Sequence, residues 1–137
     1  MNKAKLGLTV VLVVVAAVAS GFLWGAWGRW GVERELRDTQ ARLLLAQAQG
    51  ALCGARMDLA ELNYGKAGGA IDRARTIMQS LVARLEQSDR REAAAAVREA
   101  MAKAGEAQQS AASIDQAAAG RVADALKALQ RADGAQK

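Results

Sequence analysis

The sequence predicts an all-α protein in which a single N-terminal transmembrane helix precedes a four-helix antiparallel bundle or a set of stacked helical hairpins. Three observations support this prediction. Residues 6–27 carry no charge and are almost wholly apolar. The chain has no proline, and from residue 32 onwards strong helix formers such as Ala, Leu, Arg, Glu and Gln dominate it. Apolar residues recur there every three or four positions, which places them on one helix face.

The N-terminal segment has the length and flanks of a membrane anchor. A helix over residues 6–28 can cross the roughly 30 Å hydrocarbon core of a bilayer. Lys3 and Lys5 precede it, and tryptophans suited to the membrane–water interface follow its centre. We therefore predict a membrane anchor over residues 1–31 and a helical interaction domain over residues 32–137.

A cleaved signal peptide is the alternative reading of this segment. Ala17-Val18-Ala19 before Ser20 fits the small-residue pattern of a cleavage site. The apolar run continues past that point to Trp24, which favours an uncleaved anchor. The short basic N-terminus favours a cytoplasmic amino end. We therefore expect a single-pass protein of a bacterial inner membrane, with its C-terminal domain in the periplasm.

Five residues of the anchor are candidates for contacts inside the membrane. Gly21 and Gly25 form a G-x-x-x-G pattern, whose small residues let two membrane helices approach closely. Trp24, Trp27 and Trp30 share a broad helix face. They are expected to anchor in the lipid interface or to pack on a partner subunit.

The first domain helix is predicted from Glu33 to Asn63, continuing directly from the membrane segment. It carries two apolar stripes at helical spacing. The first comprises Leu45, Ala48, Leu52, Ala55, Leu59 and Leu62. The second comprises Leu36, Leu43, Ala46, Cys53, Met57, Ala60 and Tyr64. Two adjacent stripes suit packing against more than one helix, so Cys53 is expected to be a buried thiol.

Glycines and capping signals divide the rest of the chain. Glycines 65, 68 and 69 predict a turn near 64–68, and the next helix is expected to end near Gln87. Asp89 followed by Glu92 predicts a capping box that opens a third helix over about 90–111.

The fourth helix is expected over about 114–132. Ser113, with Gln116 three residues later, is predicted to cap its start, and Asp133-Gly134 to stop it. The core positions of the third helix are almost all alanine, so that helix must pack closely on its neighbours or weakly.

One segment resembles a known repeat. Tyr64, Ala67, Ile71 and Ala74 follow the pattern Y-x-x-A-x-x-x-I-x-x-A, which resembles the second half of a tetratricopeptide (TPR) repeat. The resemblance covers about residues 50–87. It implies a helical hairpin whose concave side could hold a peptide or another helix. Upstream, the chain departs from the repeat, because small or charged residues occupy the positions of its bulky ones.

Composition excludes several kinds of chemistry. The chain has no histidine and one cysteine, so the commonest general base, a cysteine-rich zinc site and an internal disulfide are absent. Beyond residue 31, 16 basic side chains face 14 acidic ones. That near balance is unlike the basic stripe of a nucleic-acid-binding protein. We therefore expect that the protein is not an enzyme and that it binds no cofactor, no metal and no nucleic-acid partner.

The function that remains is protein binding at a membrane. We expect an accessory or scaffold subunit that binds other subunits of a membrane protein complex, with Tyr64, Ala67 and Ile71 as the soluble contact. Two alternatives stay open. One is a self-assembling coiled coil that forms homo-oligomers through Leu36, Leu43, Cys53 and Met57. The other is a helical-bundle sensor module.

Overall fold

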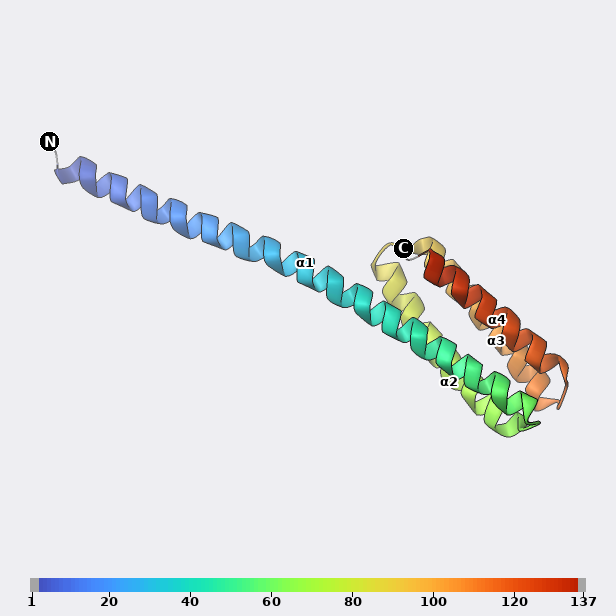
Figure 1. The fold of residues 1–137 in the computed structure, drawn as a ribbon. Helices are drawn as coiled ribbons and strands as arrows, with labels where there is room; N and C mark the ends of the chain where they lie inside the picture. The colour runs from blue at the N-terminus through green and yellow to red at the C-terminus, as the bar shows by residue number, and fades with distance from the viewer. Residues whose placement is uncertain (1–2, 136–137) are drawn as a thin grey trace. The chain divides into compact units, whose positions relative to one another are not determined.

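A computed structural model of the chain contains four α-helices and no strand among the residues that it describes (Figure 1). These are the backbone of residues 3–135 and the side chains of Val15, Val18 and residues 33–135. The helices are α1 (Lys3–Ala60), α2 (Tyr64–Gln87), α3 (Arg91–Ala112) and α4 (Ala117–Gly134). The prediction of an all-α helical bundle is confirmed.

The chain divides into two compact units, residues 1–38 and residues 39–137. The first unit holds the N-terminal part of α1, and the second joins the C-terminal part of α1 to α2, α3 and α4. Apart from Val15 and Val18, the predicted anchor over residues 6–28 lies outside the residues whose side chains are described. Among the residues that the structure describes, no helix is long and apolar enough to cross a membrane.

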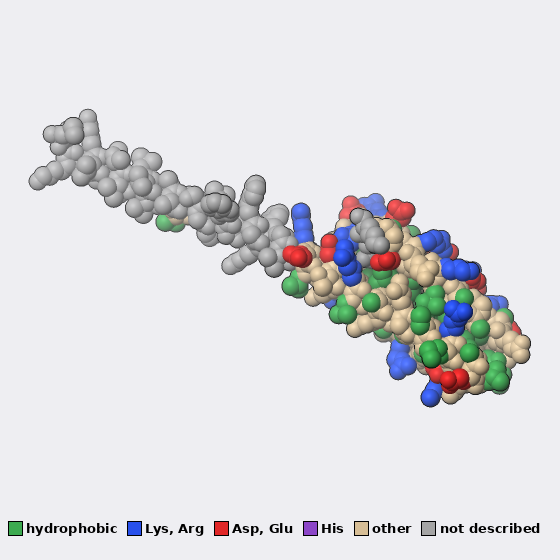
Figure 2. Space-filling view, in the orientation of Figure 1, with side chains coloured by type: hydrophobic (Ala, Val, Ile, Leu, Met, Phe, Trp, Pro, Cys, Tyr) green, Lys and Arg blue, Asp and Glu red, His purple; other side chains and the backbone are tan. Residues whose placement is uncertain are grey.

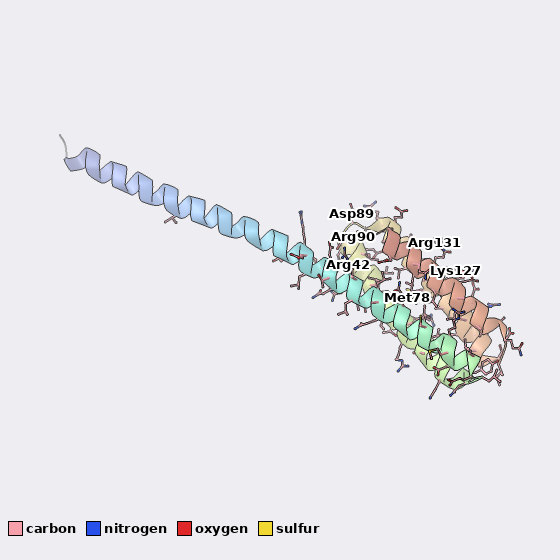
Figure 3. All side chains as sticks on the ribbon, viewed as in Figure 1. Arg42, Met78, Asp89, Arg90, Lys127 and Arg131 are labelled. Atoms are coloured by element: carbon pink, nitrogen blue, oxygen red, sulfur yellow. The ribbon has the colours of Figure 1, made fainter. Side chains whose placement is uncertain are left out.

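The bundle of residues 39–137 has one core, built largely from alanine. All four helices contribute buried residues to it, and the apolar residues that α3 buries are alanines except Val97. Leu52, Ile71, Leu81 and Met78, the last labelled in Figure 3, are among the few large side chains that are fully buried. Small side chains bring helix axes close together, so the third helix packs through close approach rather than through bulk.

The first apolar stripe of α1 faces this core, and the second faces outward. Leu45, Ala48, Leu52, Ala55 and Leu59 are buried, as predicted. Leu62, expected at the end of the same stripe, lies beyond α1 and is exposed. The second stripe takes no part in this core, because Leu36, Leu43 and Met57 are exposed.

Three turns connect the helices, and all three have the same backbone geometry. In each, one residue adopts a left-handed conformation: Leu62 at φ 57°, Asp89 at φ 55° and Ile114 at φ 56°. Its N–H donates to the carbonyl three residues earlier, and the next N–H donates to the carbonyl five residues before it. This is the Schellman motif, which satisfies carbonyls at a helix C-terminus. Short turns of this kind make successive helices antiparallel.

The first turn lies earlier than the glycines indicated. It occupies residues 61–63, and glycines 65, 68 and 69 lie inside α2. Asn63 caps α2, because its side-chain oxygen accepts a hydrogen bond from the Lys66 N–H at 3.3 Å. That cap explains why three glycines fail to delay the helix. The predicted end of this helix at Gln87 is confirmed.

Both predicted caps farther along the chain are wrong. Asp89 occupies the left-handed position of the turn and pairs with Arg91 at 3.0 Å, and the N-cap of α3 is Arg90. The Ser113 hydroxyl donates to the carbonyls of Gln109 and Ser110, so Ser113 belongs to the C-terminus of α3. In both cases the Schellman motif of the preceding helix fixes the backbone where a capping box would need an extended residue.

Long polar side chains connect neighbouring helices around the core. Arg84 of α2 donates to Gln40 of α1, and Arg75 Nη1 donates to Gln108 Oε1 of α3 at 2.6 Å. Arg98 of α3 pairs with Glu86 of α2. Arg131 of α4 pairs with Glu99 of α3 at 2.7 Å. Each of these contacts joins two helices that are consecutive in the chain: α1 to α2, α2 to α3, or α3 to α4.

Candidate functional site

The side chains of the bundle offer a binding surface rather than reactive groups. Among the residues searched, no three histidine, cysteine or acidic side chains come together to hold a metal ion. Acidic and basic side chains are interspersed over the face seen in Figure 2, with apolar side chains between them. The candidate site is therefore sought among exposed apolar residues.

The strongest cluster of this kind lies at one end of the bundle, where the α1–α2 and α3–α4 turns lie side by side (Figure 1). Leu62 is 69% exposed and Ile114 is 70% exposed. Tyr64, the first residue of α2, is half-buried between them. We call Leu62, Tyr64 and Ile114, with glycines 65, 68 and 69, the end surface.

The backbone holds the two exposed side chains outward. Leu62 and Ile114 each adopt the left-handed backbone conformation in their turns. This conformation is unfavourable for residues with a side chain, and most of all for β-branched residues. The conformation costs about 1–2 kcal/mol for a residue other than glycine. Asn or Asp tolerates it better, as Asp89 does at the opposite end. Two large apolar residues thus stand at positions that folding alone would give to glycine or asparagine.

Two depressions adjoin these side chains. The smaller, of about 190 Å³, is lined by Leu59, Leu62, Tyr64, Asp115, Gln116 and Ala119. The larger, of about 400 Å³, is lined by Tyr64, Gly65, Gly68, Gly69, Gln108, Ala111, Ala112 and Ile114. Tyr64 lines both depressions.

Three glycines line the larger depression, and they have no side chains to cover the helix backbone there. A Cβ atom built on Gly65, Gly68 or Gly69 would meet nothing within 4 Å, so these glycines are not required by packing inside the chain. Each weakens α2 by about 0.5–1 kcal/mol relative to alanine. Their effect is to leave helix backbone uncovered beside Tyr64 and Ile114, where the backbone of another helix or peptide can approach closely.

The structure separates the three residues predicted to bind a partner. Tyr64 reaches the surface, but Ala67 and Ile71 are fully buried in the core. A direct contact can therefore involve only Tyr64 of the three. Sequence reasoning missed Leu62, which it had placed on the first stripe of α1, and Ile114, which it had placed at the start of the fourth helix. The signal that could have found them is a large apolar residue directly before Asn63 or Asp115, where a helix has to end.

The predicted intramembrane contacts at Gly21, Trp24, Gly25, Trp27 and Trp30 lie outside the side chains that the structure describes. Cys53 is described, and it is exposed. The prediction of a buried thiol is therefore wrong. The cause is the outward rotation of the second stripe of α1, which leaves Cys53 on the surface opposite the core.

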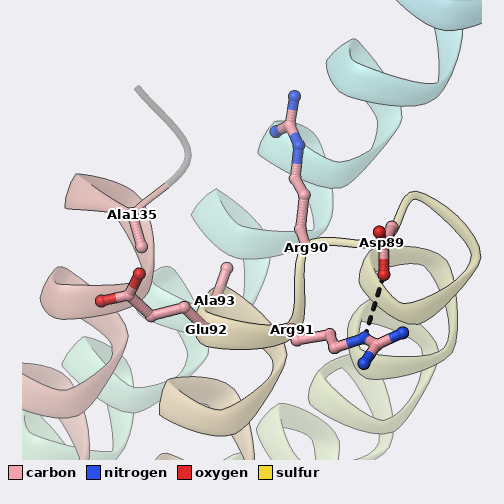
Figure 4. A pocket seen from close by; sticks show the side chains of 6 residues that line it. All are labelled: Asp89, Arg90, Arg91, Glu92, Ala93 and Ala135. Carbon is pink, nitrogen blue, oxygen red and sulfur yellow. Dashed lines mark hydrogen bonds and ion pairs between the residues drawn. The ribbon is translucent and has the colours of Figure 1, made fainter.

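A charged depression lies at the other end of the bundle. It has a volume of about 530 Å³ and is lined by Asp89, Arg90, Arg91, Glu92, Ala93 and Ala135 (Figure 4). Asp89 and Arg91 pair with each other there, and both are more than four-fifths exposed. Because these charges are already compensated and solvated, we assign no ligand to this depression.

Among known proteins, no family model matches the chain, and neither a curated protein nor a solved structure matches it.

Proposed function

We propose that this chain is a membrane-anchored accessory or scaffold subunit whose helical domain binds other proteins of a membrane complex. The uncharged run over residues 6–27 supplies the anchor, and the end surface supplies the contact. The TPR-like pattern around Tyr64 agrees with a hairpin that receives a helix or peptide.

One observation carries this proposal: Leu62 and Ile114 are large, apolar, exposed and held in a conformation that opposes them. Strain at an exposed position indicates a role outside folding. Large apolar side chains around a half-buried tyrosine are typical of the centre of a protein interface. The open glycine backbone beside them suits a helix or an extended segment rather than a small molecule.

The test replaces the two side chains without disturbing the turns. In the double variant Leu62→Asn and Ile114→Asn, asparagine tolerates the left-handed conformation, so the bundle should keep its thermal stability. Full-length protein is purified in mild detergent, and chains that co-purify at stoichiometric yield are identified by mass spectrometry. We expect a defined set of membrane proteins with the native chain and its loss with the double variant.

Asp89→Asn is the matched control, because it changes the equivalent turn at the opposite end. It should retain the full set of partners. If the double variant keeps the same partners at the same yield, the end surface is not their binding site. If the native chain brings down no stoichiometric partner, the accessory-subunit function is refuted.

A further inference from the structure

The outward face of α1 within the bundle is a second exposed apolar surface. It comprises Leu43, Ala46, Gly50, Cys53, Met57 and Ala60, all exposed, and we call it the outer face. Leu43 is 57% exposed and Met57 is 67% exposed. In the numbering of an ideal helix this face lies opposite the stripe from Ala41 to Leu59 that fills the core.

Its residues repeat with the spacing of a coiled coil. Steps of three and four alternate from Leu43 to Ala60, which is the a and d spacing of a heptad. The register extends in the sequence to Leu36, which is also exposed. The core stripe of α1 has the same period, so one helix carries two opposed seams. The helices of the bundle cover only one of them.

We infer that the outer face pairs with the outer face of a second copy of this chain, in register and parallel. The inference deepens the proposed function by naming one partner of the domain. It rests on that function in one respect, because a shared membrane anchor would hold both copies in the same orientation.

The size of the side chains fits self-pairing. Leu43 and Met57 lie toward the two ends of the outer face, and Ala46, Gly50 and Cys53 lie between them. Small central residues let two helices approach closely, and the larger ones then close the seam on both sides. A Cβ added at Gly50 would meet nothing within 4 Å, so this chain leaves the centre of the seam open.

The flanking charges select the parallel arrangement. Arg56 falls at a g position and Glu61 at the e position five residues later, a pair that meets between parallel chains. In the antiparallel arrangement that aligns the same apolar positions, Leu43 lies opposite Ala60, and Arg56 and Glu61 then lie nearest to glutamines of the other copy. Parallel pairing therefore forms two opposite-charge contacts that antiparallel pairing does not form.

Cys53 makes the inference directly testable, because it is the only cysteine in the chain. In the parallel pair the two Cys53 residues face each other at a d position, within the distance a disulfide can bridge. In the antiparallel pair that aligns Leu43 with Ala60, the two Cys53 residues are offset by only about 4.5 Å along the axis, whereas two residues at position 60 are about 25 Å apart, so position 60 distinguishes the two arrangements. Full-length protein in mild detergent is oxidised with copper phenanthroline and run on a non-reducing gel.

We expect the native chain to form a covalent dimer that reductant reverses. Two cysteine relocations in a Cys53→Ser background control for random collision. Ala60→Cys, at another d position, should restore the dimer only if the chains are parallel. Ala102→Cys, exposed on α3, should not. Equal crosslinking through residue 102, or none through residues 53 and 60, overturns the inference.

Charge reversal provides a second readout that does not depend on cysteine. Arg56→Glu should weaken dimerisation roughly fivefold, because attraction becomes repulsion at two symmetric contacts. Adding Glu61→Arg should restore it. The dissociation constant is measured by sedimentation in density-matched detergent. A single variant that binds as tightly as the native chain, or a double variant that stays weak, contradicts the parallel seam.

The two proposals fail separately. Loss of the Cys53 crosslink with partner binding intact at the end surface would remove the self-pairing and leave the accessory function. Binding of a different membrane protein to the outer face, detected as protection of Cys53 from maleimide with no dimer present, would also overturn the self-pairing.

Discussion

The three turns place Leu62, Asp89 and Ile114 in the same left-handed backbone conformation, but these residue types do not tolerate it equally well. Ile114 is β-branched and is therefore the most strained of the three. Because it is 70% exposed, its removal loses little buried area. We expect Ile114→Gly to raise the free energy of unfolding by up to about 1 kcal/mol, since relief of strain outweighs the added freedom of glycine in the unfolded chain.

The measurement is chemical unfolding of the full-length protein, with Asp89→Gly as the matched change at the α2–α3 turn. Asp89→Gly should gain less, because aspartate already tolerates the conformation. A loss of stability in Ile114→Gly would show that the Ile114 side chain makes a stabilising contact at the end surface. The interpretation of its strain as functional would then fail.

The Glu99–Arg131 pair gives the bundle a defined pH dependence. The hydrogen bond from Arg131, together with its charge, lowers the pKa of Glu99 below 4.5 and raises the pKa of Arg131. A lowered folded-state pKa means that this contribution to stability is complete above about pH 4.5. It is lost as the pH falls through the lower value.

Glu99→Gln should therefore lower the Tm at neutral pH and have a smaller effect at acidic pH, because protonation of native Glu99 removes the same charge. Thermal unfolding at both pH values measures this. The difference should be small, because both side chains are about half exposed or more. An equal loss of Tm at both pH values would show that packing, not charge, explains the effect of the substitution.

At the scale of the helix, α1 shows which parts of a sequence pattern determine structure. Both of its apolar stripes have helical spacing, and each could have faced the bundle. The stripe that does so carries the leucines at 45, 52 and 59, whereas the other carries Gly50 and Cys53 at its centre. An alanine-rich bundle needs its few large side chains inside. Periodicity alone could not show which stripe faces the core, and so the prediction that Cys53 is buried was wrong.

One substitution made on each stripe separates their contributions. Leu52 is fully buried and Leu43 is 57% exposed, on the same helix. Leu52→Ala should lower the free energy of unfolding by about 2–5 kcal/mol, because it leaves a cavity in a core with few large residues. Leu43→Ala should lower it by less than about 0.5 kcal/mol in the isolated chain.

Denaturant unfolding at several protein concentrations distinguishes the two effects. The Leu52→Ala loss should be the same at every concentration, because it arises inside one bundle. A Leu43→Ala loss that grows with concentration would come from the paired chain. Equal losses in both variants at high dilution would mean that the assignment of the two stripes is incorrect.

Helix identity and order could be predicted from the sequence because alanine, leucine and the absence of proline leave few alternatives. The end at Gln87 and the alanine core of α3 followed from composition and spacing. The turns could not be placed to the residue, because non-glycine residues occupy the left-handed positions where glycine is the usual signal. The end surface was missed for the same reason, since Leu62 was placed on a stripe of the first helix and Ile114 at the start of the fourth, whereas both lie in turns.

At the scale of the whole molecule, the proposed anchor determines where the bundle acts. The apolar run over residues 6–27 should keep the full chain in the membrane fraction after carbonate extraction, and deletion of residues 1–31 should release the helical domain.

Fusion of alkaline phosphatase to the C-terminus in a bacterial host should give an active enzyme if the domain is periplasmic. The intact mass distinguishes the two readings of the segment, because cleavage before Ser20 would remove the first 19 residues from a 14.4 kDa chain. A protein that stays in the membrane at full mass and exports the fused phosphatase fits a retained anchor. A shortened, extractable protein would mean that the bundle works as a secreted domain, and its partners would then have to reach it in solution.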